Sequence, residues 1–264
     1  LLAAVNENKI SNEDKFFCEN GKFKIPGTTL HDWKPYGELT FEEVFMKSSN
    51  IGVAKIVQLL GPDIFSGYLK RLEFGRLSGI DLPGEAKGLV KSLDKWSRTS
   101  AYIIPIGQEV GVNLLQLVRA FAAVVNGGYL VKPHLVKSIC SQDFCEESTF
   151  TSKKRIFPKS SADRAKDILI AVVSEGTGKR AQVKGRKIGG KTGTAQKYDT
   201  KLKRYSSSKY RATFVGFIAD LNPPLAIGVT IDEPQRSHFG GVVAAPVFKN
   251  IAQKVIKYIE GAGN

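Results

Sequence analysis

The feature that most constrains the fold of this 264-residue chain is a pair of apolar segments near its C-terminal end. Residues 211–220 (RATFVGFIAD) and residues 225–234 (LAIGVTIDEP) are separated by the turn sequence LNPP. Both segments are rich in β-branched and aromatic residues, so we predict two strands of one hairpin. Both faces of these strands are apolar, which requires helices on both sides of the sheet. We therefore predict an α/β fold in which an antiparallel sheet lies between helical layers.

Caps and apolar periodicity mark the helices that could cover this sheet. Thr40 followed by Glu43 is a capping-box pattern, which predicts a helix from that point. The tripeptide Ser48-Ser49-Asn50 interrupts it, and a second helix is predicted over residues 51–60, ended by Gly61-Pro62. The tripeptide is therefore expected at a junction between two helices.

Three more helices are predicted further along the chain. Residues 113–125 are apolar on nearly every side, which indicates a deeply buried helix. Ser160 or Ser161 is expected to cap a helix that runs to Val173. One apolar stripe predicts a C-terminal helix; Val247, Ile251, Val255 and Ile259 recur in it every four residues, with Phe248, Ala252 and Ile256 alongside.

We assign residues 1–264 to one domain, with a polar surface insertion over residues 137–159. The opening LLAAVNENKI has the character of a helix already in progress, so we expect the chain to be an N-terminally truncated part of a longer protein. Cys140 and Cys145 could close a small disulfide loop, or they could remain free thiols. The sequence contains no C-x-x-C motif and no Cys/His cluster, so we predict no metal or other cofactor.

Residues 185–196 (GRKIGGKTGTAQ) can be interpreted in two ways. The segment from Gly185 to Thr192 satisfies the phosphate-binding P-loop pattern, whereas Lys191-Thr192-Gly193 is a K-T-G triplet, which belongs to acyl-enzyme chemistry. A P-loop needs a helix that opens at its lysine, but no apolar face recurs at helical spacing after Thr192. We therefore predict a strand over residues 191–196 that runs out into a long basic loop and pairs with residues 211–220. A P-loop nucleotide hydrolase stays as a minor alternative.

A K-T-G triplet on an edge strand suits peptide recognition. A strand edge offers backbone N–H and C=O groups to an extended peptide, and Gly193 would let that peptide approach closely. Lys191 and the hydroxyls of Thr192 and Thr194 can hold a carboxylate by charge and hydrogen bonds. The sequence has no G-x-S-x-G elbow for a histidine-based triad, so we interpret its three histidines as surface or core residues; they are His31, His134 and His238.

Several segments together resemble a known family. SSNIGVAKI (residues 48–56), GKTGTAQK (190–197), FVGFIAD (214–220) and IDEP (231–234) resemble the transpeptidase domain of class B penicillin-binding proteins, particularly the septal cell-division branch. GQEVGVNLLQL and EGTGKRA are similar too. The resemblance implies the penicillin-binding serine transferase fold and an enzyme that cross-links peptidoglycan stem peptides through a serine acyl-enzyme and binds β-lactams. It also implies an inner-membrane protein with a periplasmic catalytic domain, partnered by a membrane-embedded glycosyltransferase and other division proteins.

The resemblance also implies roles for single residues. Ser48 would relay a proton to or from the leaving group, Asn50 would position the substrate amide, and Lys191 would supply positive potential. Ser49, Thr192, Gly193 and Thr194 would contact the substrate, with Thr192 and Thr194 on its terminal carboxylate. The N–H of Thr194 would form half of an oxyanion hole. From the residues alone, Ser48 could instead cap a helix and Asn50 could be a turn residue.

The sequence departs from the family pattern in one respect. The family's nucleophile lies in an S-x-x-K motif before S-x-N, but the only such strings here are Ser92–Lys95 and Ser206–Lys209, which both follow it. We therefore expect the nucleophile and its lysine base upstream of Leu1.

Other classes of protein fit less well. A non-enzymatic β-lactam sensor shares the fold, whereas a class A β-lactamase is disfavoured because SSN replaces S-D-N. The net charge of +14 favours anionic surroundings such as a membrane surface, an acidic polymer or nucleic acid. The mixture of tyrosine with lysine and arginine in residues 197–211 would suit a nucleic-acid binder, but a loop at the mouth of a peptide cleft explains it equally well. We predict no nucleic-acid partner.

The position of the S-x-x-K strings leads to a first prediction. The 264-residue chain by itself should form no covalent adduct with a fluorescent penicillin, because neither Ser92 nor Ser206 precedes the S-x-N motif. Gel electrophoresis under denaturing conditions measures this, with a known penicillin-binding enzyme as the positive control. A labelled band that disappears in Ser92→Ala or Ser206→Ala would show that the expectation is wrong.

Overall fold

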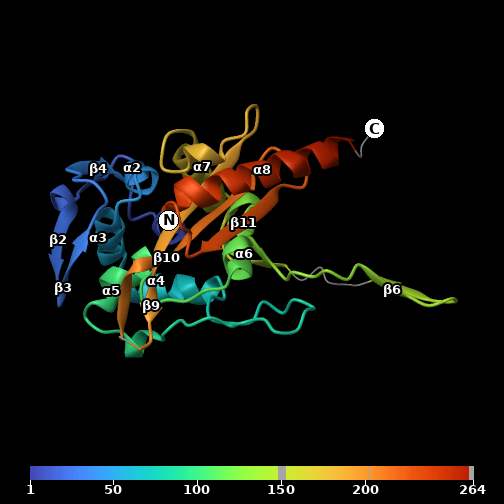
Figure 1. Ribbon diagram of the computed structural model, residues 1–264, viewed down its shortest axis with the longest axis horizontal. Helices are drawn as coiled ribbons and strands as arrows, with labels where there is room; N and C mark the ends of the chain where they lie inside the picture. Colours follow the sequence, from blue (N-terminus) through green and yellow to red (C-terminus); the bar gives the residue numbers. More distant parts are fainter. Residues whose placement is uncertain (148–152, 202, 262–264) are drawn as a thin grey trace.

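A three-stranded antiparallel sheet forms the centre of the protein (Figure 1). The computed structural model describes residues 1–147, 153–201 and 203–261. The strands lie in the order β11-β10-β9, and they are β9 (Ile188–Asp199), β10 (Arg204–Ile218) and β11 (Leu225–Asp232). The predicted pairing of the K-T-G segment is confirmed, since Lys191 pairs with Val215 and Gln196 with Tyr210. A strand therefore continues past Thr192, and the helix that a P-loop needs there is replaced by β9.

The long basic loop predicted between these strands was wrong. β9 continues to Asp199 and β10 begins at Arg204, with an irregularity in the ladder between Tyr205 and Tyr210. Tyr198 and Tyr205 are cross-strand partners whose ring centroids lie 5.4 Å apart. This end of the hairpin is mostly exposed and buries no apolar face, so its sequence lacks the hydrophobic alternation that would have predicted strands.

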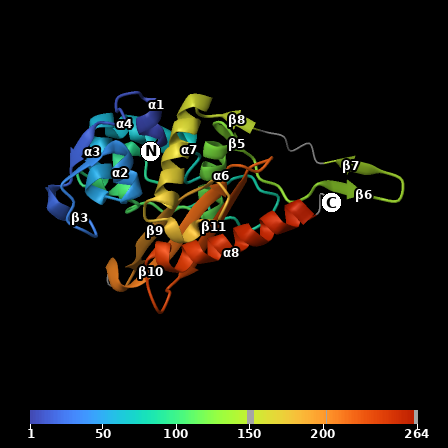
Figure 2. The ribbon, with the colours of Figure 1, turned by 90° about the horizontal axis from the view of Figure 1, so that it is seen from above.

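Helices cover both faces of the sheet, as predicted (Figure 2). On one face lies α8 (Gly240–Gly261), whose Phe248 ring meets that of Phe214 at a centroid distance of 4.8 Å. The other face is covered by α6 (Leu114–Val125) and α7 (Lys159–Ser174), which pack around Phe217. Phe214 and Phe217 lie three positions apart on β10 and so point to opposite faces, which explains why both sides of this strand are apolar.

The N-terminal half builds a second apolar core beside the sheet (Figure 1). Fully buried side chains such as Phe41 and Ile51 lie at its centre. It consists of short elements, namely α1 (Leu2–Asn6), β1 (Lys15–Phe17), β2 (Lys22–Ile25), β3 (Thr28–His31), β4 (Glu38–Thr40), α2 (Phe41–Met46), α3 (Asn50–Leu60) and α4 (Pro62–Arg71), with α5 (Ser100–Ile103) further along the chain. The site described below lies where this unit meets β9.

The helix starts agree with the sequence except at α7. Thr40 and Glu43 form the predicted capping box at α2, with both reciprocal hydrogen bonds present. The cap predicted at Ser160 or Ser161 was wrong, because α7 begins at Lys159 and its N-cap is Pro158, two residues before Ser160. The Ser161 hydroxyl instead donates a hydrogen bond to Oδ1 of Asn6, at 3.0 Å. A tertiary partner therefore outcompeted the local capping interaction.

The two apolar helices differ from expectation in what they bury. α6 is buried against the sheet, but it also carries the buried polar residues Gln116 and Arg119. On α8, the part of the predicted stripe formed by Phe248, Ala252 and Ile256 faces the sheet, whereas Val247 and Ile251 are exposed by 39% and 38%. The three strands of the sheet cover only part of the circumference of α8, so some of the apolar residues of this helix stay exposed.

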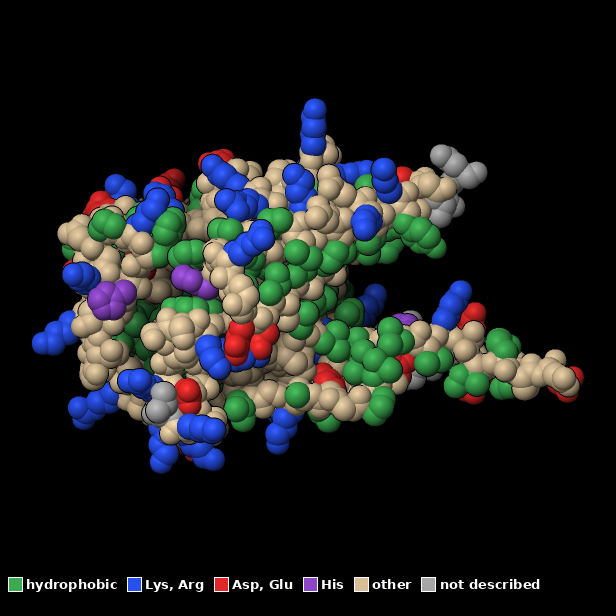
Figure 3. Space-filling model, in the orientation of Figure 1, with side chains coloured by type: hydrophobic (Ala, Val, Ile, Leu, Met, Phe, Trp, Pro, Cys, Tyr) green, Lys and Arg blue, Asp and Glu red, His purple; other side chains and the backbone are tan. Residues whose placement is uncertain are grey.

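The predicted insertion at residues 137–159 divides into two parts. Its first part is a projecting hairpin of β6 (Ser138–Cys140) and β7 (Cys145–Glu147), with hydrophobic side chains on its surface (Figure 3). Its last part belongs to the body of the protein, since β8 (Lys153–Arg155) pairs with β5 (Tyr129–Val131) and Phe157 is buried. Cys140 and Cys145 are joined in a disulfide at the hairpin, and Cys18 is free and buried.

Candidate active site

Lys191 and Ser48 meet where β9 lies against the N-terminal unit. The Nζ atom of Lys191 donates a hydrogen bond to the Oγ atom of Ser48 at 2.6 Å, although 143 positions separate the two residues. A second bond from the same ammonium group reaches the carbonyl oxygen of Thr192 at 3.3 Å. The strand therefore presents its lysine to the junction between α2 and α3, as the sequence indicated.

Ser48 owes its position to the way in which α2 ends. Its N–H donates to the carbonyl of Phe45, and the N–H of Ser49 donates to that of Val44, at 3.3 and 3.0 Å. These two bonds form a Schellman motif, in which the penultimate residue is left-handed and is usually glycine. Ser48 occupies that position with φ of 57°. A strained residue of this kind is typical of functional sites, and here it points a hydroxyl at Lys191.

The ammonium group of Lys191 is buried without a carboxylate partner. Desolvation lowers the pKa of Lys191 from 10.5 to about 8. Among the described residues no acidic side chain forms an ion pair with it, and Ser48 contributes only a neutral hydroxyl. A buried charge without an opposite charge strongly favours the entry of an anion. The positive charge of Lys191 is therefore available to an anionic ligand.

The residues that follow Lys191 alternate between the two faces of β9. Thr192 and Thr194 lie on the face opposite Lys191, towards the start of α8. The Thr192 hydroxyl donates to that of Thr177 at 3.2 Å, and the Thr194 hydroxyl accepts a hydrogen bond from the N–H of Gly240 at 3.1 Å. β9 is an edge strand of this sheet, and only one of its sides pairs with β10. The backbone groups on its other side are placed to pair with a further strand.

A side chain at Gly193 would meet no tight contact within the protein. A Cβ atom built there would lie 3.5 Å from the Cβ of Thr213, which is an ordinary van der Waals distance. Packing inside the described chain therefore does not explain a glycine at this position. Close approach of a ligand to the backbone would explain it.

The Ser49 side chain is buried inside the protein, which corrects the expectation that it contacts substrate. Its side chain is 1% exposed, and its hydroxyl donates to Oδ2 of Asp32 at 2.6 Å. The same oxygen caps α3 by accepting from the N–H of Gly52 at 2.9 Å. The capping role that the sequence left open for Ser48 thus belongs to its neighbour.

Asn50 begins α3 beside this cap. Its Nδ2 donates to the carbonyl of His31 at 2.9 Å. Among the bonds of the described residues, none joins the Asn50 side chain to Ser48 or Lys191. Asn50 is therefore at the helix junction, as predicted, with its amide held by strand β3.

A groove of about 830 Å³ continues along β9 beyond the K-T-G triplet. One wall is β9 and β10, including Ala195 and Tyr205, and the other is formed by residues from 89–95 and 107–111. The N–H of Glu109 donates to the Tyr205 hydroxyl at 3.2 Å, which joins the two walls. Four cationic side chains line the groove, namely Lys91, Lys95, Lys197 and Arg211. Sequence reasoning missed these residues because they come from segments far apart in the chain; the resemblance of GQEVGVNLLQL was the only signal.

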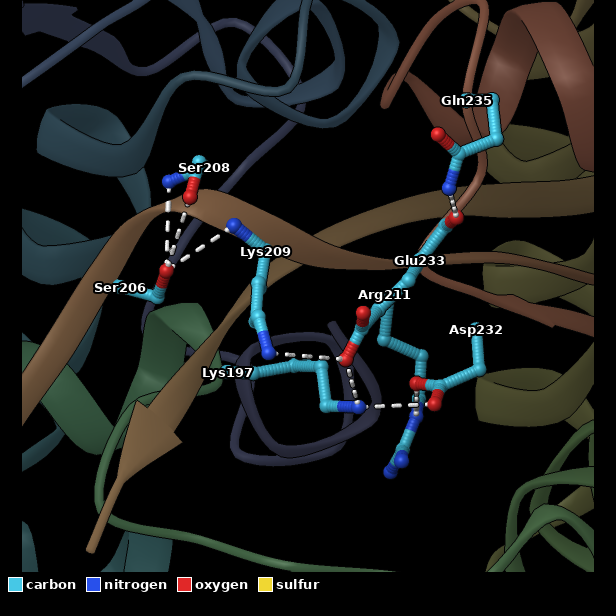
Figure 4. A network of polar contacts seen from close by, with 8 residues as sticks. All are labelled: Lys197, Ser206, Ser208, Lys209, Arg211, Asp232, Glu233 and Gln235. Carbon is cyan, nitrogen blue, oxygen red and sulfur yellow. Dashed lines mark hydrogen bonds and ion pairs between the residues drawn. The ribbon is translucent and has the colours of Figure 1, made fainter. Parts of the chain in front are cut away.

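The S-x-x-K string in the β10 hairpin lacks the geometry of a nucleophile and its base (Figure 4). The Lys209 ammonium lies 4.0 Å from a carboxylate oxygen of Glu233. The Ser206 hydroxyl instead accepts backbone N–H bonds from Ser208 and Lys209, at 3.2 and 3.0 Å. A serine nucleophile needs a base within hydrogen-bond reach of its hydroxyl. Ser92 lies in the wall of the groove, just before a 3₁₀ turn over Leu93–Lys95.

The described part of the chain offers neither a metal site nor a membrane-spanning helix. Residues 1–147, 153–201 and 203–261 contain no group of three His, Cys, Asp or Glu side chains placed to hold a metal ion. Within the same residues, no helix combines the length and the apolar character that crossing a membrane requires.

Comparison with known proteins places this geometry in a family. A family model described as the penicillin-binding protein transpeptidase domain matches residues 1–253. Penicillin-binding protein PbpB of Mycobacterium tuberculosis is 34% identical over 262 residues, covering 95% of this chain and 39% of the relative. Stage V sporulation protein D of Bacillus subtilis is also 34% identical, over 257 residues, covering 95% of this chain and 40% of the relative. The chain thus spans about two fifths of the length of these relatives.

A solved structure shows the same fold. The crystal structure of penicillin-binding protein 3 from Mycobacterium tuberculosis, complexed with aztreonam, superimposes with a TM-score of 0.91 at 32% sequence identity. The match covers 98% of this chain and 60% of that chain. The predicted penicillin-binding serine transferase fold is therefore confirmed.

The left-handed backbone at Ser48 predicts an unusual order of stabilities. Ser48→Gly should be more stable than Ser48→Ala by about 1 kcal/mol, because both remove the hydroxyl but only glycine adopts this conformation without strain. Urea unfolding of the two variants measures the difference. Lys47, with φ of −87°, is a matched control at which glycine should be the less stable replacement. Equal stabilities at residue 48 would contradict the strain.

The buried ammonium of Lys191 predicts a pH-dependent gain on its removal. The folded-state pKa of about 8 is below the ordinary 10.5, so between these values the unfolded chain binds more protons and wild-type stability rises with pH. Lys191→Met should therefore be more stable than wild type at pH 7, and its advantage should shrink above pH 8. Urea unfolding at pH 7 and pH 9.5 tests this, with exposed Lys257→Met as the control. A variant that is less stable at pH 7 would contradict the desolvation of Lys191.

Proposed function

Because the chain belongs to the penicillin-binding protein transpeptidase family, we propose that the complete protein is a peptidoglycan D,D-transpeptidase. It would cross-link stem peptides through a serine acyl-enzyme, and β-lactams would acylate the same serine. Two relatives support this assignment by name, since the PenA protein of Neisseria gonorrhoeae and the PbpC protein of Pseudomonas aeruginosa are both called probable peptidoglycan D,D-transpeptidases.

The observation that carries the proposal is the contact between Lys191 and Ser48. A transpeptidase must protonate a departing amine and later deprotonate an incoming one, which needs a hydroxyl close to the scissile bond. Ser48 supplies such a hydroxyl, and the ammonium of Lys191 at 2.6 Å makes it a better proton donor. Asn50, next to Ser48 on the same junction, would position the amide of the substrate.

The K-T-G strand would bind the end of the stem peptide. Lys191 supplies the positive potential for the terminal carboxylate, and the hydroxyls of Thr192 and Thr194 supply hydrogen bonds to it. The substrate would add to the free edge of β9 as an extra strand, close to the backbone at Gly193. The N–H of Thr194 would then form half of the oxyanion hole for the tetrahedral intermediate.

The nucleophile in this proposal is the serine of the S-x-x-K motif expected upstream of Leu1. Structures of the Mycobacterium tuberculosis relative are described as complexes with aztreonam and with ampicillin, which supports β-lactam binding by this family. In this chain the carboxylate or sulfonate of such a ligand would lie against Lys191, where the peptide carboxylate would lie.

The cellular setting follows from the same family resemblance. The proposal places the catalytic domain on the periplasmic side of the inner membrane, working in septal wall synthesis with a glycosyltransferase and other division proteins. The net charge of +14 is in keeping with an anionic polymer or membrane surface nearby.

The pKa of Lys191 gives this function a measurable signature. For the complete protein, kcat/KM for release of D-alanine from a stem pentapeptide should fall as pH rises through about 8, because deprotonated Lys191 no longer attracts the carboxylate. In Lys191→Arg the guanidinium stays charged, so the residual activity should not show this fall.

Three outcomes separate the alternatives. Release of D-alanine with the expected pH profile supports the transpeptidase. Acylation by a fluorescent penicillin without any peptide reaction would favour a β-lactam sensor of the same fold. A fall of the same size in wild type and Lys191→Arg would exclude Lys191 as its cause.

A further inference from the structure

The turn after α7 contacts both α2 and β9. α7 ends at Ser174, and the next residues form the sequence Glu-Gly-Thr-Gly. Within this turn Thr177 is half-buried, and it makes one hydrogen bond to the α2 side of the site and another to the β9 side. It therefore joins the element that presents Ser48 to the element that presents Lys191.

The first of these bonds comes from the backbone of Thr177. Its N–H donates to the carbonyl oxygen of Met46 at 3.1 Å. Met46 is the last residue of α2, where carbonyl groups have no partner within the helix. Gly176 permits this contact, because a Cβ atom there would lie 2.4 Å from the same carbonyl oxygen. The turn thus holds the helix end two residues before Ser48.

The second bond comes from the side chain of Thr177. Its hydroxyl oxygen lies 3.2 Å from the hydroxyl oxygen of Thr192, which donates to it in this structure. Thr192 follows Lys191 on β9 and lies on the opposite face of the strand. A hydroxyl can donate or accept, so the direction of this bond can reverse when a ligand competes for one of the two protons.

We propose that Thr177 is a positioning residue for the carboxylate of the substrate, and that it acts through Thr192. When a carboxylate enters, the Thr177 hydroxyl donates to Thr192, and the Thr192 hydroxyl turns its own proton to the carboxylate. Thr177 thereby keeps the acceptor side of Thr192 satisfied while Thr192 serves as a donor. The ligand class is a peptide or β-lactam with a free carboxylate, so this inference rests on the proposed function.

The proposal predicts how Thr177→Val should behave in the complete protein. Valine has the shape of threonine without the hydroxyl, so KM for the stem pentapeptide should rise about three- to tenfold, the range for one lost hydrogen bond, with kcat nearly unchanged. Thr177→Ser keeps the hydroxyl and should restore KM to within about twofold of wild type. D-alanine release measures both constants.

A double-mutant cycle distinguishes action through Thr192 from a general structural effect. Thr177→Val should add no further rise in KM to the Thr192→Val variant, because the hydroxyl on which it acts is already absent. Thr230→Val is the matched control, since it removes a threonine–threonine contact of 3.2 Å, to Thr213, elsewhere in the same sheet. Its KM should equal that of wild type.

Several results would overturn the inference. They are an unchanged KM in Thr177→Val, a rise that persists in the Thr192→Val background, or a failure of serine to rescue. A fall in kcat alone, with a lowered melting temperature, would show that Thr177 only stabilises the fold. If the wild-type protein releases no D-alanine, the proposed function fails first, and that result is distinct from a wild-type reaction that is indifferent to Thr177.

Discussion

The site depends on one ammonium group that the protein buries without neutralising it. Lys191 contacts the hydroxyl of Ser48 at 2.6 Å, and desolvation lowers its pKa to about 8. A protein that used this lysine for stability alone would pair it with a carboxylate, as it pairs Lys197 with Asp232 at 2.7 Å. An unpaired buried charge lowers the stability of the ligand-free protein and raises its affinity for an anion. The sheet, its helical layers and the N-terminal unit together hold this lysine against that serine.

The elements around Lys191 and Ser48 can hold these two residues together because their backbones approach closely at glycines. Gly176 lies against the end of α2, and Gly240 lies where a Cβ atom would come within 2.4 Å of the carbonyl oxygens of Gly193 and Thr213. Larger residues at either position would move the turn after α7 or the start of α8 away from β9. The geometry of the K-T-G strand is therefore set partly by glycines that lie outside the motif. This dependence is of the kind expected when a catalytic constellation has to be positioned to within a fraction of an ångström.

The sequence predicted the sheet, its helical layers and the pairing of the K-T-G strand because each of these depends on local hydrophobic pattern. It also placed the SSN tripeptide at a helix junction, because the capping signals around it are local as well. What it could not supply were contacts between distant segments. The groove wall at residues 89–95 and 107–111, the extension of β9 past Gln196 and the position of Thr177 depend on tertiary partners. The same reason explains the error at the start of α7. The cap was predicted at Ser160 or Ser161, but the Ser161 hydroxyl donates a hydrogen bond to the distant Asn6.

In both the S-S-N motif and the K-T-G motif, neighbouring residues make contacts on different sides of the backbone, which their sequences do not show. In each of them one residue contacts the other motif, and the next one forms a hydrogen bond to a different part of the protein. Ser48 points to Lys191, whereas Ser49 is buried on Asp32 and caps α3. Lys191 points to Ser48, whereas Thr192 turns to the opposite face of β9 and bonds to Thr177. At the helix junction the left-handed turn at Ser48 separates the neighbours, and on the strand the two-residue alternation of side chains separates them. Adjacent residues of a motif therefore make different contacts because the backbone sends them to opposite sides, and the position of each motif depends on both contacts.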